Sequence, residues 1–117
     1  FMGKLIVSLM IFFNMGAPSA LVNTFKHENI VYMDKFVDGP IVVHSFGNAI
    51  LMSKEQLCDY FELVFRDMEI VHADIEKRVK GKVDVYCLTI YTRNGAYYVT
   101  NKLYFDIYKK KIVQVRI

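Results

Sequence analysis

The chain has 117 residues and a mass of 13.7 kDa, which is the size of a single domain. Apolar residues make up 54% of it and charged residues 23%, a balance that excludes a disordered chain. The formal net charge of +3 is too small to predict a nucleic-acid partner, and two cysteines are too few for a disulfide framework or a cysteine-rich zinc module. We therefore expect one domain over residues 1–117, with a core rich in Phe and Tyr.

The first twenty residues admit three interpretations. The apolar run over 5–15 is too short to span a membrane as a helix. A secretory signal peptide would use Lys4 in its charged start and Pro18-Ser19-Ala20 as its cleavage site. A buried helix would use apolar residues that recur at helical spacing, namely Ile6, Leu9, Met10, Phe13 and Ala17. We favour the buried helix and a cytoplasmic protein, whereas the signal peptide would make the protein secreted.

Residues 16–46 are predicted to hold one short helix and two short strands. Gly16 can end the first helix, and Pro18 suits the first turn of a second one that ends near 26–29. The apolar spacing then changes to two, which predicts strands over 30–37 and 41–46 around a turn at 38–40.

The clearest helix covers residues 53–68. Ser53 and Gln56 form a capping-box pattern at its start. Its apolar stripe has helical spacing and consists of Leu57, Phe61, Val64, Phe65 and Met68. Four strands are predicted after it, over 69–79, 83–92, 96–108 and 111–117. The order α-α-β-β-α-β-β-β-β indicates an α+β fold with the helices on one face of a curved antiparallel sheet.

The turn between strands 83–92 and 96–108 decides which side chains face the core. A three-residue turn, Arg93-Asn94-Gly95, places Cys87, Thr89 and Tyr91 on the inner face with Tyr97, Asn101 and Leu103. The outer face then gathers more apolar side chains than a solvent-facing sheet exposes together: Tyr86, Leu88, Ile90, Tyr98 and Tyr104. We expect these five residues to form the interface of a homodimer.

Five segments carry a family resemblance: Phe12-Phe-Asn-Met-Gly16, Ala20-Leu-Val22, Ile30-Val-Tyr-Met-Asp34, Ser53-Lys-Glu-Gln-Leu-Cys-Asp-Tyr-Phe61 and Tyr104-Phe-Asp-Ile-Tyr-Lys-Lys-Lys-Ile112. In their order and spacing the chain resembles the nuclear transport factor 2-like superfamily, which includes ketosteroid isomerase, scytalone dehydratase and SnoaL-like polyketide cyclases. The resemblance implies a cone in which a bent sheet wraps a long helix, with a pocket at the open end. It also implies dimers through the outer sheet face. Because this fold hosts both enzymes and non-catalytic binding modules, the resemblance predicts a fold rather than a reaction.

Asp34 is the candidate catalytic residue. On a strand over 30–37 it would share an apolar face with Tyr32 and Phe36, and burial there would suit it to proton abstraction. By resemblance it falls where ketosteroid isomerase keeps its general base. Residues 1–20 contain no Tyr, His or acid that could complete an oxyanion hole, so steroid isomerase chemistry is not expected. The alternative is a solvated Asp near a turn.

The residues expected to line the pocket are polar and aromatic side chains: Tyr32, Thr89, Tyr91, Tyr97, Asn101 and Gln114. Asn101 is a mid-strand amide that must bond either a ligand or a neighbouring group. The three histidines lack metal-ligand spacing, and the chain has no phosphate-binding glycine loop, so neither a metal nor a cofactor is expected. His72 and Asp74 are expected to meet on the outer face.

We therefore predict a domain that binds a small apolar or amphipathic ligand in an apolar pocket. Its catalytic form would be an enzyme of the lyase, isomerase or cyclase type with Asp34 as the base. The alternative is a non-catalytic, homodimeric protein-interaction module of the same fold. Neither a nucleic acid nor a membrane is expected as a partner.

Overall fold

The structure is a computed structural model and describes residues 16–117. The expected first helix begins in residues 1–15, so that prediction lies outside the described residues. The described elements, in chain order, are α2 (Ala17–Lys26), the 3₁₀ turns η1 (Ile30–Tyr32) and η2 (Asp34–Phe36), β1 (Ile41–Ser45), β2 (Asn48–Met52), α3 (Lys54–Asp67), β3 (Glu69–Val79), β4 (Asp84–Asn94), β5 (Tyr97–Tyr108) and β6 (Lys111–Arg116).

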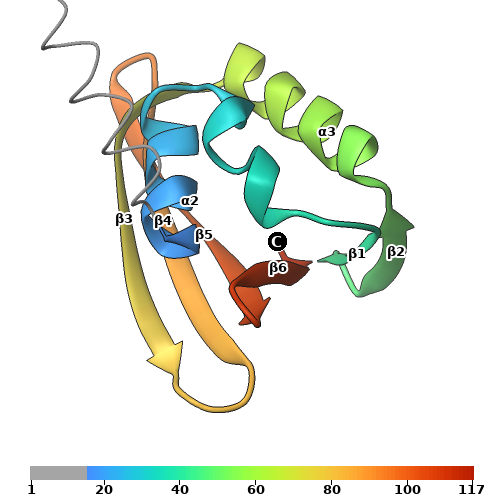
Figure 1. The fold of residues 1–117 in the computed structure, drawn as a ribbon. Helices are drawn as coiled ribbons and strands as arrows, with labels where there is room; N and C mark the ends of the chain where they lie inside the picture. The colour runs from blue at the N-terminus through green and yellow to red at the C-terminus, as the bar shows by residue number, and fades with distance from the viewer. Residues whose placement is uncertain (1–15) are drawn as a thin grey trace, which may run out of the picture.

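One six-stranded sheet has the order β2-β1-β6-β5-β4-β3. Its neighbours are antiparallel except for β1 and β6, which run parallel, so the sheet is mixed rather than wholly antiparallel. The sheet curls around the space that α2, η1, η2 and α3 occupy (Figure 1). The predicted α+β architecture is therefore confirmed.

Helix α3 forms for the local reasons that the sequence shows. The Ser53 hydroxyl accepts from the Gln56 N–H at 3.1 Å, and the Gln56 side chain accepts from the Ser53 N–H at 2.8 Å. This capping box satisfies donors that the first turn of a helix would otherwise leave unpaired. Leu57, Phe61 and Phe65 of the apolar stripe are buried, whereas Met68 at its end is exposed. Phe61 packs edge-on against Phe25 with 5.1 Å between ring centres. Both rings are fully buried, so the helix is anchored at the centre of the core.

The strand predicted over 30–37 is wrong. This segment forms η1 and η2, and the Asn29 side chain caps the first of them by accepting from the Val31 N–H at 3.1 Å. In a 3₁₀ helix, residues three apart lie on the same side, and Met33 and Phe36 are the pair that enters the core. The apolar residues of this segment satisfy that spacing as well as they satisfy the alternation of a strand.

After β1, Phe46-Gly47 forms a two-residue hairpin turn. Ser45 pairs with Asn48, and a strand that the sequence analysis missed, β2, follows directly. This strand takes the place of the one expected over 30–37, so the number of strands in the sheet is still six.

The predicted register of β4 against β5 is also wrong. The last pair is Asn94 with Tyr97, so the turn is Gly95-Ala96 rather than the expected three residues. Gly95 is left-handed, with a φ of +64°, as a two-residue hairpin turn with glycine in the first position requires. The pairing moves by three residues, an odd number, so β4 presents to the core the face that was expected outside. Leu88 and Ile90 are accordingly buried.

Candidate functional site

Asp34 lies on η2 and its side chain is 55% exposed. Its carboxylate forms an ion pair with the Lys54 ammonium at 3.1 Å. Between the inward-facing Met33 and Phe36, the 3₁₀ geometry turns Asp34 outward. The predicted catalytic role required apolar surroundings for Asp34, and these are absent.

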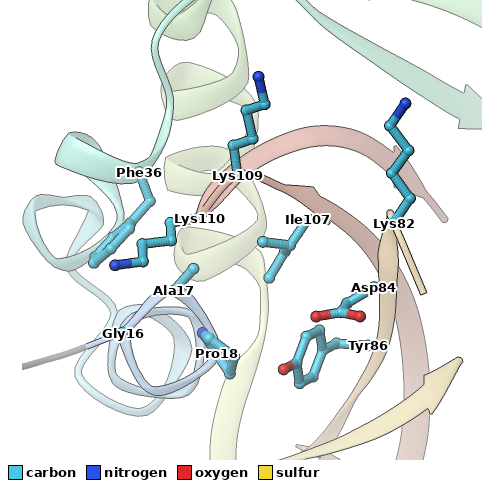
Figure 2. Close-up of a pocket in the computed structure, with 10 residues that line it drawn as sticks. All are labelled: Gly16, Ala17, Pro18, Phe36, Lys82, Asp84, Tyr86, Ile107, Lys109 and Lys110. Carbon is cyan, nitrogen blue, oxygen red and sulfur yellow. The ribbon is translucent and has the colours of Figure 1, made fainter. Parts of the chain in front are cut away.

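A cavity of about 540 Å³ lies at the start of α2 (Figure 2). It collects residues from four parts of the chain that are remote in sequence: Gly16, Ala17, Pro18, Phe36, Lys82, Asp84, Tyr86, Ile107, Lys109 and Lys110. Small-molecule sites usually measure about 300–1,000 Å³, so this cavity has room for an organic ligand. Asp34 does not line it.

The lining of this cavity combines apolar and basic side chains. Phe36, Tyr86 and Ile107 supply rings and a branched aliphatic chain, and Lys82, Lys109 and Lys110 supply three ammonium groups. In Figure 2 the Lys82 and Lys109 side chains extend to one side, whereas Lys110 extends toward Phe36. The combination suits a ligand with an apolar body and a negative group.

The one carboxylate in the wall, that of Asp84, already has partners. It accepts a hydrogen bond from the Gly81 N–H at 3.1 Å and lies 3.8 Å from the Lys77 ammonium. The Lys77 ammonium also lies 5.5 Å from the centre of the Tyr86 ring. None of Lys82, Lys109 and Lys110 has a carboxylate partner within the described part of the chain. The rim therefore keeps an excess of positive charge.

The turn that carries two of these lysines has an unusual backbone. Lys109 and Lys110 both adopt left-handed conformations, with φ of +48° and +66°. Two-residue hairpin turns of this kind favour Asn and Gly, because a side chain in this region is strained. No pattern in the sequence indicated that Lys82 would lie near this turn.

A second hollow lies between α3 and the sheet, where the pocket of a cone fold was expected. Asn101 lines both a small cavity of about 80 Å³ beside Phe61 and a more open one of about 270 Å³ beside Met68 and Arg93. Its side-chain amide donates to the Thr92 hydroxyl at 3.5 Å. The protein's own side chains thus fill most of the space beneath α3, and Asn101 has the neighbouring-group contact that was one of its two predicted roles.

The other residues predicted to bind a ligand do not converge. Thr89, Tyr91 and Gln114 lie on the outer face of the sheet, opposite Lys102, Thr100 and Asp106 of β5. Tyr97 is 77% exposed near the tip of the β4–β5 hairpin. Tyr32 stacks on His27 with 5.4 Å between ring centres. The corrected register accounts for Thr89 and Tyr91, because both follow the reversed face of β4.

The five residues expected to form a dimer interface are divided between the two faces. Tyr98 and Tyr104 lie on the outer face, as predicted. Leu88 and Ile90 are buried core residues, and Tyr86 packs against the same core. The outer face therefore lacks the apolar centre on which that interface depended.

Other predicted contacts can be placed directly. His72 and Asp74 meet on the outer face at 2.8 Å, along one strand rather than across two. Cys58 and Cys87 are both buried free thiols.

Residues 16–117 contain no group of three or more His, Cys, Asp or Glu side chains placed to hold a metal. No helix in that range is long and apolar enough to cross a membrane.

Comparison with known proteins identifies the fold. No protein-family model and no curated protein matches the chain. A DUF4783 family protein from Bacteroides fragilis YCH46 is similar in structure, with a TM-score of 0.65 at 14% identity over 85% of this chain and 94% of its own. A proposed polyketide cyclase from Sinorhizobium meliloti gives 0.64 at 14% identity over 84% and 89%. The structure described as "Rd1NTF2_04 with long sheet" gives 0.63 at 14% identity over 83% and 92%.

The chain has the nuclear transport factor 2-like cone fold. The resemblance seen in the sequence is thus confirmed at the level of structure. Sequence identities this low establish the fold alone, and the same fold supports different functions.

Proposed function

We propose that this cone-fold domain binds a small amphipathic anion in the cavity at the start of α2. The observation that carries the proposal is the 540 Å³ cavity itself, with Phe36, Tyr86 and Ile107 in its wall and three lysines at its rim. The apolar body of the ligand would lie against the rings, and its negative group would lie near the lysines. Burial of the apolar part favours binding by about 25 cal/mol per Å² removed from water.

The role proposed is binding rather than turnover. Among the described residues of the cavity wall, Asp84 carries the only carboxylate, and it is already held by Gly81 and Lys77. Asp34 is exposed and paired with Lys54. A general base must reach the proton that it removes, and neither group is free within this cavity to do so. The lysines would instead favour a ligand that carries a negative charge.

The proposal can be tested with a pair of rigid aromatic probes, 2-naphthoate and the 2-naphthylmethylammonium ion, which differ chiefly in the sign of their charge. Titration calorimetry on the full chain should show at least tenfold tighter binding of the carboxylate, and this preference should weaken as salt is added. Equal affinity for both probes, or no binding of 2-naphthoate, would contradict the proposal.

Two variants localise the binding. Lys110→Glu should weaken 2-naphthoate binding at least tenfold, while Lys102→Glu, an exposed change on the outer face of β5, should leave it unchanged. Ile107→Trp should fill the cavity and abolish binding, provided that thermal unfolding shows that the variant is still folded. Retained binding in both Lys110→Glu and a folded Ile107→Trp would place the ligand elsewhere.

A further inference from the structure

The two edges of the sheet differ sharply in how they are protected. The β3 edge carries several charged residues and has pairing irregularities between Ile70 and His72 and between Lys77 and Val79. Charges and bulges are the usual means by which proteins prevent an edge strand from pairing with another chain. One edge is therefore built to remain unpaired.

The β2 edge has none of these features. Residues 46–52 contain no charge and no proline. Ile50 is 49% exposed and Leu51 is 66% exposed, and within residues 16–117 only β1 pairs with this strand. An uncharged, exposed apolar edge is the kind of strand to which a further strand can be added.

The hairpin tip next to this edge adds a second, independent observation. Phe46 is 97% exposed and has a φ of +51°, the left-handed region that an aromatic residue rarely adopts. Neither packing within the described residues nor backbone preference accounts for a phenylalanine there. Its ring is therefore available to contact a group outside residues 16–117.

The ladder geometry identifies the partner that fits. In a two-residue hairpin the flanking residues, here Ser45 and Asn48, form the first hydrogen-bonded pair, and the pairs then alternate. The outward N–H and C=O groups of β2 are therefore those of Ala49 and Leu51. If a second β2 runs antiparallel about a two-fold axis at Ile50, then Ala49 of each copy lies opposite Leu51 of the other. All four outward groups on each copy are then paired, and no charges meet.

We propose that two copies of this chain associate through antiparallel pairing of β2 with β2, with Ile50 on the two-fold axis. Phe46 alone offers roughly 200 Å² of surface. Together with Ile50 and Leu51, the two copies would cover on the order of 800 Å², which is below the usual size of a stable interface. The dimer is accordingly weak and forms only as the protein concentration rises.

Sedimentation of the full chain, from low micromolar to near-millimolar concentration, tests the association. The wild-type chain should pass from monomer to dimer, and Leu51→Lys should raise the dissociation constant at least tenfold. The matched control is Val71→Lys on the opposite edge, which is 44% exposed in the wild-type chain and should leave the constant unchanged. A chain that stays monomeric throughout, or a dimer that only Val71→Lys disrupts, overturns the proposal.

A crosslink tests the register. Directly opposed residues in a non-hydrogen-bonded pair have Cα atoms about 4.5 Å apart, and disulfides need roughly 4.4–6.8 Å. Mild oxidation of Ile50→Cys should therefore give a covalent dimer, whereas Ala49→Cys, which lies opposite Leu51 rather than itself, should give little. Both native cysteines are buried and should not interfere. Equal crosslinking of the two variants would show that the strands do not meet in this register.

The variant Phe46→Asn distinguishes an effect on dimerisation from an effect on the stability of the fold. Asn tolerates a left-handed backbone, so this variant should melt at a higher temperature than the wild-type chain while dimerising at least tenfold more weakly. A variant that is both more stable and equally dimeric would show that Phe46 has no part in the interface.

Discussion

The register of β4 can be tested by comparing two neighbouring residues, Leu88 and Thr89. Leu88 is fully buried in the core, while Thr89 lies on the outer face and is half-buried. Truncating a buried leucine to alanine removes its transfer free energy and leaves a cavity, at a cost of about 2–5 kcal/mol. Thr89→Ala removes only a small outer side chain and should cost less than about 1 kcal/mol.

The size of the effect follows from the chain length. At about 2.1 cal/mol/K per residue, the unfolding entropy of this chain is roughly 250 cal/mol/K, so that 1 kcal/mol shifts the melting temperature by about 4 °C. Leu88→Ala should therefore lower the midpoint by about 8–20 °C, and Thr89→Ala by less than about 4 °C. Because domains of this size have stabilities of about 5–15 kcal/mol, both variants should still fold.

Thermal unfolding followed by circular dichroism measures both changes. The three-residue turn considered in the sequence analysis would place Thr89 inside and Leu88 outside, which reverses the expected order. A larger loss of stability for Thr89→Ala than for Leu88→Ala would refute the register described here.

Three further outcomes follow from local contacts. Ser53→Ala should remove the capping hydroxyl of α3 and lower stability by about 1 kcal/mol, measured by thermal unfolding. Asp34→Asn should change stability by less than about 1 kcal/mol, because both members of its pair with Lys54 are partly exposed. Burial raises the pKa of the Cys58 thiol, so its alkylation in a Cys87→Ser background should be slow near neutral pH and accelerate as the pH rises. The charge of Asp34 raises that pKa further, so adding Asp34→Asn should speed the reaction.

Each of these outcomes has a control. Ser19→Ala changes an exposed hydroxyl of α2 that caps nothing, and a loss of stability as large as that of Ser53→Ala would argue against the cap. A loss of several kcal/mol on Asp34→Asn would show that the ion pair matters more than its exposure allows. Alkylation of Cys58 that does not vary with pH would indicate that local opening, rather than thiolate formation, limits the reaction.

The sequence alone determined the elements whose signals are local. Helix α3 has its cap, its stripe and its end within 16 residues, and Ser53 and Gln56 bond in the structure as the pattern predicts. The strands after it begin and end within about two residues of their expected bounds, because turns rich in Gly, Asn and Lys separate them. These elements, in this order, were enough to predict an α+β fold with helices on one face of a curved sheet, and the resemblance to the nuclear transport factor 2-like superfamily implied the cone.

Segment 30–36 shows where a local pattern becomes ambiguous. Its apolar residues fit both the alternation of a strand and the threefold spacing of a 3₁₀ turn. The 3₁₀ conformation prevails because it buries Met33 and Phe36 together in the core, and it leaves Asp34 outside. The position of the predicted catalytic carboxylate therefore depended on packing that no short window of sequence contains.

Tertiary structure alone decided the register of β4 and the composition of the cavity. Both turn lengths around Gly95 are chemically acceptable, and the observed one buries Leu88 and Ile90 in the common core. The cavity joins the start of α2, Phe36, the start of β4 and the Lys109-Lys110 turn, segments up to 94 residues apart. Each segment is ordinary by itself, and only the curvature of the sheet around α2 brings apolar walls and lysines to one place.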